Sequence, residues 1–229
     1  MKKILVIGNS HIAALRTAKT VDETFAFHSI KDKLADVISG LDPDNYGLVI
    51  ISIAGNDHNV FGLLNHPQPF DFYLPENPHL PINPDARLLP ASLVSKTLQY
   101  RMASIFSATP TLLGHFKKPI YQIESPPPIP SDAHIQKYPG KFKNMIAQQG
   151  VSPAAFRYKL WRLHSKIVSD HCQKRGIFFI EAPKEAQDAQ GYLQEQYWNL
   201  DSTHGNALYG DLVLNQIRAI HNMGTQSFL

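Results

Sequence analysis

The amino-acid sequence predicts a three-layer α/β/α sandwich, in which helices cover both faces of a parallel sheet. Nearly continuous apolar runs, typical of strands buried on both faces, recur along the chain: residues 4–7, 24–27, 48–53, 120–123 and 177–180. Helical apolar spacing marks the segments that follow these runs: residues 12–19, 31–40, 93–106, 154–175 and 208–221. Regular alternation of strands and helices indicates one parallel sheet of about five strands.

The individual elements follow from their residues in chain order. Isoleucine, valine and phenylalanine dominate the apolar runs, as in "LVIISI" of residues 48–53. The first four helical segments combine apolar residues three and four positions apart with polar backs, which predicts one buried face for each of these helices. Gly176 directly follows residues 154–175 and is predicted to end that helix before the last strand.

Size and composition narrow the class of protein. The 229 residues are 43% hydrophobic, with a net charge of +3 and no low-complexity tract, which predicts a single domain over residues 1–229. Lysine and arginine are scattered rather than clustered, so no nucleic-acid partner is expected. One cysteine, Cys172, excludes an internal disulfide and a multi-cysteine zinc site. Neither a membrane span nor a signal peptide is expected, because the apolar runs are too short; we expect a cytoplasmic protein.

Two proline-rich insertions interrupt the alternation, at about residues 65–92 and 125–152. Proline excludes a long helix or a central strand from both. Each follows a predicted strand and should leave the carboxyl edge of the sheet, where open α/β folds bind ligands. We therefore expect both segments to form walls of a binding cleft.

Polar residues that could carry chemistry lie at predicted strand ends. Ser10, in "ILVIGNSHIAAL", lies where the first strand turns into a helix whose N–H groups could stabilise an anion. Taken alone, Ser10 could equally be the cap of that helix. Asn56, in "AGND", follows the third strand at the same edge, although a glycine–asparagine turn is common.

A third motif, "DSTHGN", precedes the last helix. Asp201 and His204 are three residues apart, so the carboxylate could reach Nδ1 of the imidazole and leave Nε2 free to accept a proton from serine. Considered alone, these two residues could simply be solvated at the start of a helix.

Taken together, "GNSH", "AGND" and "DSTHGN" resemble the blocks of the SGNH (GDSL-type) hydrolase family, in the same order from Gly8 to His204. The resemblance implies a flavodoxin-like fold with sheet order 2-1-3-4-5 and a serine esterase that needs no metal or cofactor. It implies Ser10 as nucleophile, His204 as base and Asp201 as its partner. Asn56 and the backbone N–H of Ser10 would form the oxyanion hole.

Two positions depart from the family pattern. Asn9 replaces the usual aspartate, which preserves the shape of the turn and removes a negative charge. The loop after the second strand, "FHSIKDKLADV", has no glycine at the place where the family supplies a further oxyanion donor. A backbone N–H from residues 29–31 could replace it, or the donor could be missing.

Other interpretations of the motifs remain open. One alternative is an SGNH-like domain that binds a glycan or a protein and catalyses no reaction. "GND" with His58 and "DSTH" loosely suggests a metallophosphoesterase, but no acidic residue ends the first strand. A dinucleotide site is excluded because the first turn lacks the glycine pattern. His11 and His58 are expected to pack or lie on helix surfaces rather than to contact substrate.

The substrate is defined only as a class. A polar site at the edge of a sheet suits short acyl groups carried by a sugar or another small polar molecule. Hydrolysis and acyl transfer use the same side chains, so the sequence does not separate them, and it does not predict an oligomeric state.

Overall fold

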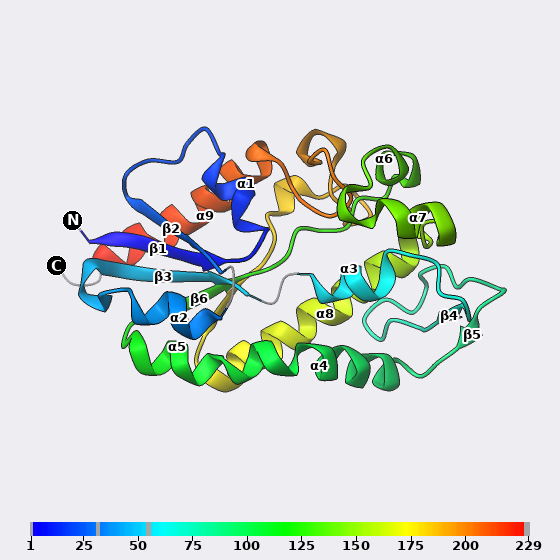
Figure 1. Cartoon of the computed structure of the whole chain (residues 1–229), viewed down its shortest axis with the longest axis horizontal. Helices are drawn as coiled ribbons and strands as arrows, with labels where there is room; N and C mark the ends of the chain where they lie inside the picture. Colours follow the sequence, from blue (N-terminus) through cyan, green and yellow to red (C-terminus); the bar gives the residue numbers. More distant parts are fainter. Residues whose placement is uncertain (1, 31–32, 54–55, 227–229) are drawn as a thin grey trace.

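The computed structural model describes residues 2–30, 33–53 and 56–226 and contains one five-stranded sheet with helices on both faces (Figure 1). All neighbouring strands of this sheet are parallel, in the order β2-β1-β3-β6-β7. The strands are β1 (Lys3–Gly8), β2 (Phe25–Ser29), β3 (Tyr46–Ser52), β6 (Ile120–Ile123) and β7 (Phe178–Ile180). Counted along the chain, this is the predicted order 2-1-3-4-5, so the α/β/α fold class is confirmed.

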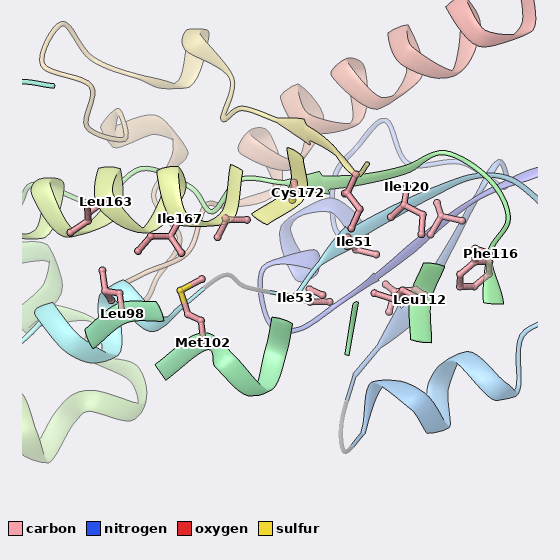
Figure 2. Close-up of a cluster of buried hydrophobic side chains, with 14 of the residues drawn as sticks. Ile51, Ile53, Leu98, Met102, Leu112, Phe116, Ile120, Leu163, Ile167 and Cys172 are labelled. Carbon is pink, nitrogen blue, oxygen red and sulfur yellow. The ribbon is translucent and has the colours of Figure 1, made fainter. Parts of the chain in front are cut away.

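Each face of the sheet carries its own layer of helices (Figure 1). One layer consists of α1 (Ile12–Arg16) and α9 (Ala207–Gln226), and the other of α2 (Leu34–Ser39), α4 (Ala91–Ser107), α5 (Thr109–His115) and α8 (Ala154–Arg175). Alternate residues of β1 point to opposite cores, so Val6 packs under the first layer and Ile7 under the second. Figure 2 shows the second core, where Leu98, Met102 and Ile167 contact one another across α4 and α8.

The two proline-rich segments extend beyond the carboxyl edge of the sheet (Figure 1). Their short elements are β4 (Phe70–Asp71) and β5 (Arg87–Leu88) in the first segment, and α6 (Asp132–Lys137) and α7 (Lys143–Gln149) in the second. A buried ion pair ties the first segment to α8, because Lys159 Nζ lies 2.5 Å from Asp71 Oδ1. Neither segment contains a long helix or a strand of the main sheet, as the prolines predict.

Element boundaries differ modestly from the predictions. The first helix ends at Arg16 instead of residue 19, because Asp211 of α9 binds both the N–H and the hydroxyl of Thr20 and holds this loop away from a helical path. The last strand starts at Phe178, since the N–H of Ile177 donates to Cys172 O at the end of α8. Gly176 ends α8 in the left-handed region with φ of 68°, as predicted.

Several short elements were not predicted. The helix α3 (Asp57–Gly62) and four 3₁₀ turns connect the main elements; the turns are Pro43–Asn45, Gly140–Phe142, Lys184–Ala186 and Glu195–Tyr197. The predicted helix over residues 31–40 begins outside the described residues and is seen as Leu34–Ser39. Among the helices that the structure describes, none combines the length and the apolar character needed to cross a membrane.

The helices α1 and α9 pack against each other without room for a side chain at Gly210. A β-carbon on Gly210 would overlap the carbonyl of Ala14 and would lie 3.0 Å from the N of Leu15. Since α1 starts just after Ser10 and α9 starts just after His204, this contact sets the distance between the two segments that carry those residues.

Gly210→Ala should therefore force α9 away from α1 and lower the free energy of unfolding by about 1–3 kcal/mol, the usual cost of overpacking. Urea unfolding followed by circular dichroism would measure it. Gly114→Ala is the matched control, because Gly114 is also helical but has no neighbour within 4 Å of the added carbon. Equal stability of the wild type and Gly210→Ala would contradict the claim of a tight contact.

Candidate active site

Ser10 lies exposed at the carboxyl edge of β1, on a sharp turn into α1. The turn is closed by hydrogen bonds from Asn9 N to Ser52 O (3.2 Å) and from Ala13 N to Ser10 O (3.1 Å). A side chain at Gly8 could not fit, since a β-carbon there would lie 2.6 Å from Ile12 Cγ2 and 2.8 Å from Ser52 Cβ. The strand–helix junction can therefore bend tightly, and it presents the Ser10 hydroxyl at the edge of the sheet.

The Ser10 hydroxyl does not cap α1. The cap position belongs to His11, and no side chain makes a capping hydrogen bond there. Instead, Ser10 Oγ lies 2.7 Å from Nε2 of His204, a residue 194 positions later in the chain. The alternative of a simple helix cap is therefore wrong.

His204 is held by Asp201 on the opposite side of its ring. Nδ1 lies 3.0 Å from Asp201 Oδ2. A carboxylate can only accept a hydrogen bond, so Nδ1 carries the proton and Nε2 presents a lone pair to the Ser10 hydroxyl. The three side chains thus form one directed chain of hydrogen bonds, and the alternative of a solvated Asp201 and His204 is also wrong.

The Asp201 carboxylate is itself fixed in place. Oδ1 accepts hydrogen bonds from the N–H groups of Thr203 and His204, both at 2.9 Å, and Oδ2 accepts one from Asn199 Nδ2 at 2.7 Å. Burial alone would raise the pKa of Asp201. The hydrogen bonds and the charge interaction with His204, together with the backbone donors, outweigh it and hold the pKa well below its usual range. Asp201 therefore remains ionised beside His204.

Two further residues support this loop, and the sequence interpretation missed both. His134 of α6 places Nε2 2.9 Å from Asn199 O and 3.2 Å from Asp201 O, which ties the second proline-rich segment to the loop. Asn206 caps α9 by accepting from the N–H groups of Leu208 (2.9 Å) and Tyr209 (3.2 Å). An asparagine just before a helix is a capping signal, so Asn206 was predictable; nothing in the sequence links His134 to Asp201.

Asn56 lies at the same edge, immediately before the first residue of α3. Its side-chain oxygen accepts a hydrogen bond of 3.0 Å from Asn59 Nδ2. No partner within the described part of the chain binds Asn56 Nδ2, so the NH₂ group is available to a ligand. Gly55, the preceding residue of the predicted motif, lies outside the described residues.

One of the backbone donors considered in the loop after β2 is already engaged in the sheet. Ile30 N donates to Gly8 O at 2.9 Å as part of the sheet, so this N–H cannot also serve an oxyanion. Lys31, another of the donors considered, lies outside the described residues. Ser29 receives a hydrogen bond from Arg16 Nη2 at 2.7 Å through its hydroxyl.

His11 and His58 are packing residues, as predicted, but they pack in the interior rather than on helix surfaces. The His11 ring is buried and lies 4.7 Å from the ring of His204. The ring of His58 lies 4.7 Å from that of His164 on α8, and neither His58 nitrogen has a hydrogen-bond partner in the described chain. Burial, followed by the influence of His164 and His11, holds the pKa of His58 well below its usual range.

Two cavities meet beside Ser10. One, of about 370 Å³, is lined by Ser10, Arg16 and Ser29 among others. The second, of about 560 Å³, shares Asn9 and Ile30 with the first and is also lined by Ile53, which follows β3, and by residues of α2 and α4 that include Leu34 and Ile105. Neither proline-rich segment lines these two cavities; the second segment instead reaches the Asp201 loop through His134.

The described residues also do not support the interpretation of these motifs as a metal site. In the described ranges, no three His, Cys, Asp or Glu side chains converge in a way that could hold a metal ion. Asp57, which follows Asn56, instead lies 3.6 Å from Nε of Arg101. Asp57 thus serves a contact separate from that of Asp201 and His204.

Comparison with known proteins finds similarity to this chain in fold and not in sequence. The sequence matches no protein-family model and no curated protein sequence. A GDSL-like lipase from Bacteroides thetaiotaomicron is 14% identical over 97% of this chain and 89% of its own, with a TM-score of 0.49. Phospholipase A1 from Streptomyces albidoflavus is 13% identical over 94% and 98% of the two chains, also with a TM-score of 0.49.

A further solved structure, 12% identical, covers 97% of this chain and 98% of its own with a TM-score of 0.50. Likeness at such identities concerns the fold alone. The sheet order, and the places of Ser10, Asn56 and Asp201–His204 at its carboxyl edge, are those that the resemblance to SGNH (GDSL-type) hydrolases implies. The resemblance is therefore confirmed at the level of the fold.

Proposed function

We propose that the chain is an SGNH-type serine hydrolase that cleaves carboxylic esters. The hydrogen-bonded chain from Ser10 through His204 to Asp201 is the observation that carries the proposal, with distances of 2.7 and 3.0 Å. It supplies an alcohol, a base in the correct tautomer and an anion that stabilises the protonated base, the three parts that acyl transfer to serine requires.

The proposed reaction has two steps. Nε2 of His204 takes the proton of Ser10 as Oγ attacks the ester carbonyl, and the resulting imidazolium then returns a proton to the departing alcohol. Water repeats the sequence on the acyl-enzyme, with His204 again as the base. The negative charge that develops on the carbonyl oxygen is stabilised by the N–H of Ser10 and the NH₂ of Asn56.

The substrate that we propose is a short-chain acyl ester of a small polar molecule or a glycan. We further propose a single domain over residues 1–229 that acts in the cytoplasm without a cofactor, a metal or a nucleic-acid partner. Transfer of the acyl group to an alcohol other than water would use the same residues. A domain that binds a glycan or a protein without turnover is the second candidate, and the loop after β2, which lacks the family glycine, favours it.

Ser10→Ala and His204→Ala should each lower kcat by about 10⁴-fold or more, because each removes a member of the relay. Hydrolysis of p-nitrophenyl esters of graded acyl length and labelling with a fluorophosphonate probe would measure this loss. Ser39→Ala is the control, since the exposed Ser39 hydroxyl bonds only within its own helix. A wild type that neither labels at Ser10 nor hydrolyses any ester would favour the non-catalytic candidate.

Asn56→Ala should lower kcat by at least about 10²-fold and change KM much less, because the amide binds an oxygen whose charge exists mainly in the transition state. With Ile30 N–H engaged in the sheet, Asn56 carries more of this stabilisation than it would beside a further donor. Steady-state kinetics on one ester would separate kcat from KM. An unchanged kcat would show that another donor occupies the oxyanion hole.

Asp201→Asn should lower kcat by about 10⁴-fold, because an amide no longer fixes the tautomer of His204. The low folded-state pKa of Asp201 means that its ionised form stabilises the fold above the unfolded aspartate pKa of about 3.9. This contribution is lost as pH falls towards the folded pKa. The variant should thus be less stable at neutral pH and lose less stability on acidification.

Urea unfolding of the wild type and of Asp201→Asn at about pH 7 and pH 3 would measure the difference. Asp85→Asn, at an exposed loop position, provides the control for loss of a surface charge. Parallel pH dependence of the wild type and Asp201→Asn would contradict a strongly bonded carboxylate.

A further inference from the structure

The side-chain amide of Asn56 can serve an oxyanion in only one of its two orientations. Its oxygen and nitrogen ends have nearly the same shape, so packing alone does not decide which end faces the site. A partner that donates to the oxygen leaves the NH₂ facing the site, because the oxygen only accepts and the NH₂ only donates. The structure contains such a donor one helical turn away, at Asn59.

Asn59 donates from Nδ2 to Asn56 Oδ1 at 3.0 Å. The bond occupies the oxygen of Asn56 and leaves its NH₂ without a partner in the described chain. The two residues are also linked through the backbone, since Asn59 N donates to Asn56 O at 3.1 Å. Both contacts lie in the first turn of α3, where residues three apart are neighbours.

Asn59 is itself held in a buried position. Its side chain is only 6% exposed, whereas Asn56 is half-buried. The helix that carries it is pressed against α8, because a β-carbon on Gly62 would overlap the side chain of Leu160. The neighbouring ring of His58 also packs against α8 through His164. Asn59 is therefore held more firmly than the more exposed Asn56, to which it donates.

We propose that Asn59 is a positioning residue that turns the NH₂ of Asn56 towards the oxyanion, a role that rests on the proposed esterase function. Asn59 touches neither Ser10 nor His204 through any hydrogen bond of the described chain and acts only through Asn56. The sequence interpretation assigned nothing to Asn59.

Reversing the polarity of the bond gives the sharpest test. In Asn59→Asp an ionised carboxylate can only accept, so the amide of Asn56 should rotate and donate its NH₂ to residue 59, away from the oxyanion. At about pH 8, where the carboxyl is ionised, kcat should fall by about 10²-fold, close to the loss for Asn56→Ala, with KM little changed. Asn59→Leu, which removes the bond without reversing it, should lose less, about 3- to 10-fold.

A double-mutant cycle separates positioning from general damage. If Asn59 acts through Asn56, adding Asn59→Asp to Asn56→Ala should change kcat by less than about 2-fold. Additive losses in the double variant, or an Asn59→Asp enzyme with the kcat of the wild type, would overturn the proposal. Asn65→Asp is the matched control, because it makes the same substitution at an exposed asparagine outside the site and should leave kcat unchanged.

Nuclear magnetic resonance of the side-chain amides tests the orientation without any turnover. In the wild type the NH₂ protons of Asn59 should exchange slowly and those of Asn56 fast; in Asn59→Asp the Asn56 protons should become protected. Asn56→Ala assigns the signals. Slow exchange at Asn56 in the wild type would overturn the inference, whereas correct amide behaviour in an enzyme that neither labels nor hydrolyses would reject the esterase function alone.

Discussion

The close approach of α1 and α9 is the constraint on which the rest of the site depends. Ser10 precedes one helix and His204 precedes the other, so their separation is decided where Gly210 meets Ala14. The same interface is strengthened at its far end, where Asp211 binds Thr20 and Arg218 lies 3.1 Å from Asp22. Helix packing thus sets a side-chain distance that neither loop could maintain alone, because no backbone hydrogen bond joins the two loops in the described chain.

Hydrogen-bond polarity, rather than shape, organises the groups at the carboxyl edge. Backbone N–H groups fix the Asp201 carboxylate, the carboxylate fixes the tautomer of His204, and the tautomer turns a lone pair towards Ser10. At the same edge, Asn59 donates to the side-chain oxygen of Asn56. Each of these bonds favours one direction for a group that could otherwise face either way. In the proposed esterase, such preorganisation would be the main source of catalytic stabilisation.

Much of the fold was predictable from the sequence because it rests on local patterns. Apolar runs such as residues 48–53 define strands whatever surrounds them, and the ends of the first and third strands place Ser10 and Asn56 at one edge. The strand order, and the place of Asp201 and His204 beside Ser10, were implied by the resemblance to the SGNH family. Helix α3 was not predictable, since "DHNVFG" has no apolar period and depends on the packing of Gly62 against Leu160. His134 was missed as a support of the Asp201 loop for a similar reason. Its contact joins residues far apart in sequence, and only the folded chain brings them together.

The 194 positions between Ser10 and His204 also matter while the protein is being made. A ribosome finishes the β1–α1 turn early, when the imidazole that would activate its hydroxyl has yet to be translated. In the proposed esterase, Ser10 would be an ordinary alcohol until α9 docks on α1, so a nascent chain could not attack esters in its surroundings. Proteolytic removal of the docked helix would have the same effect. The arrangement would make reactivity a report on completed folding.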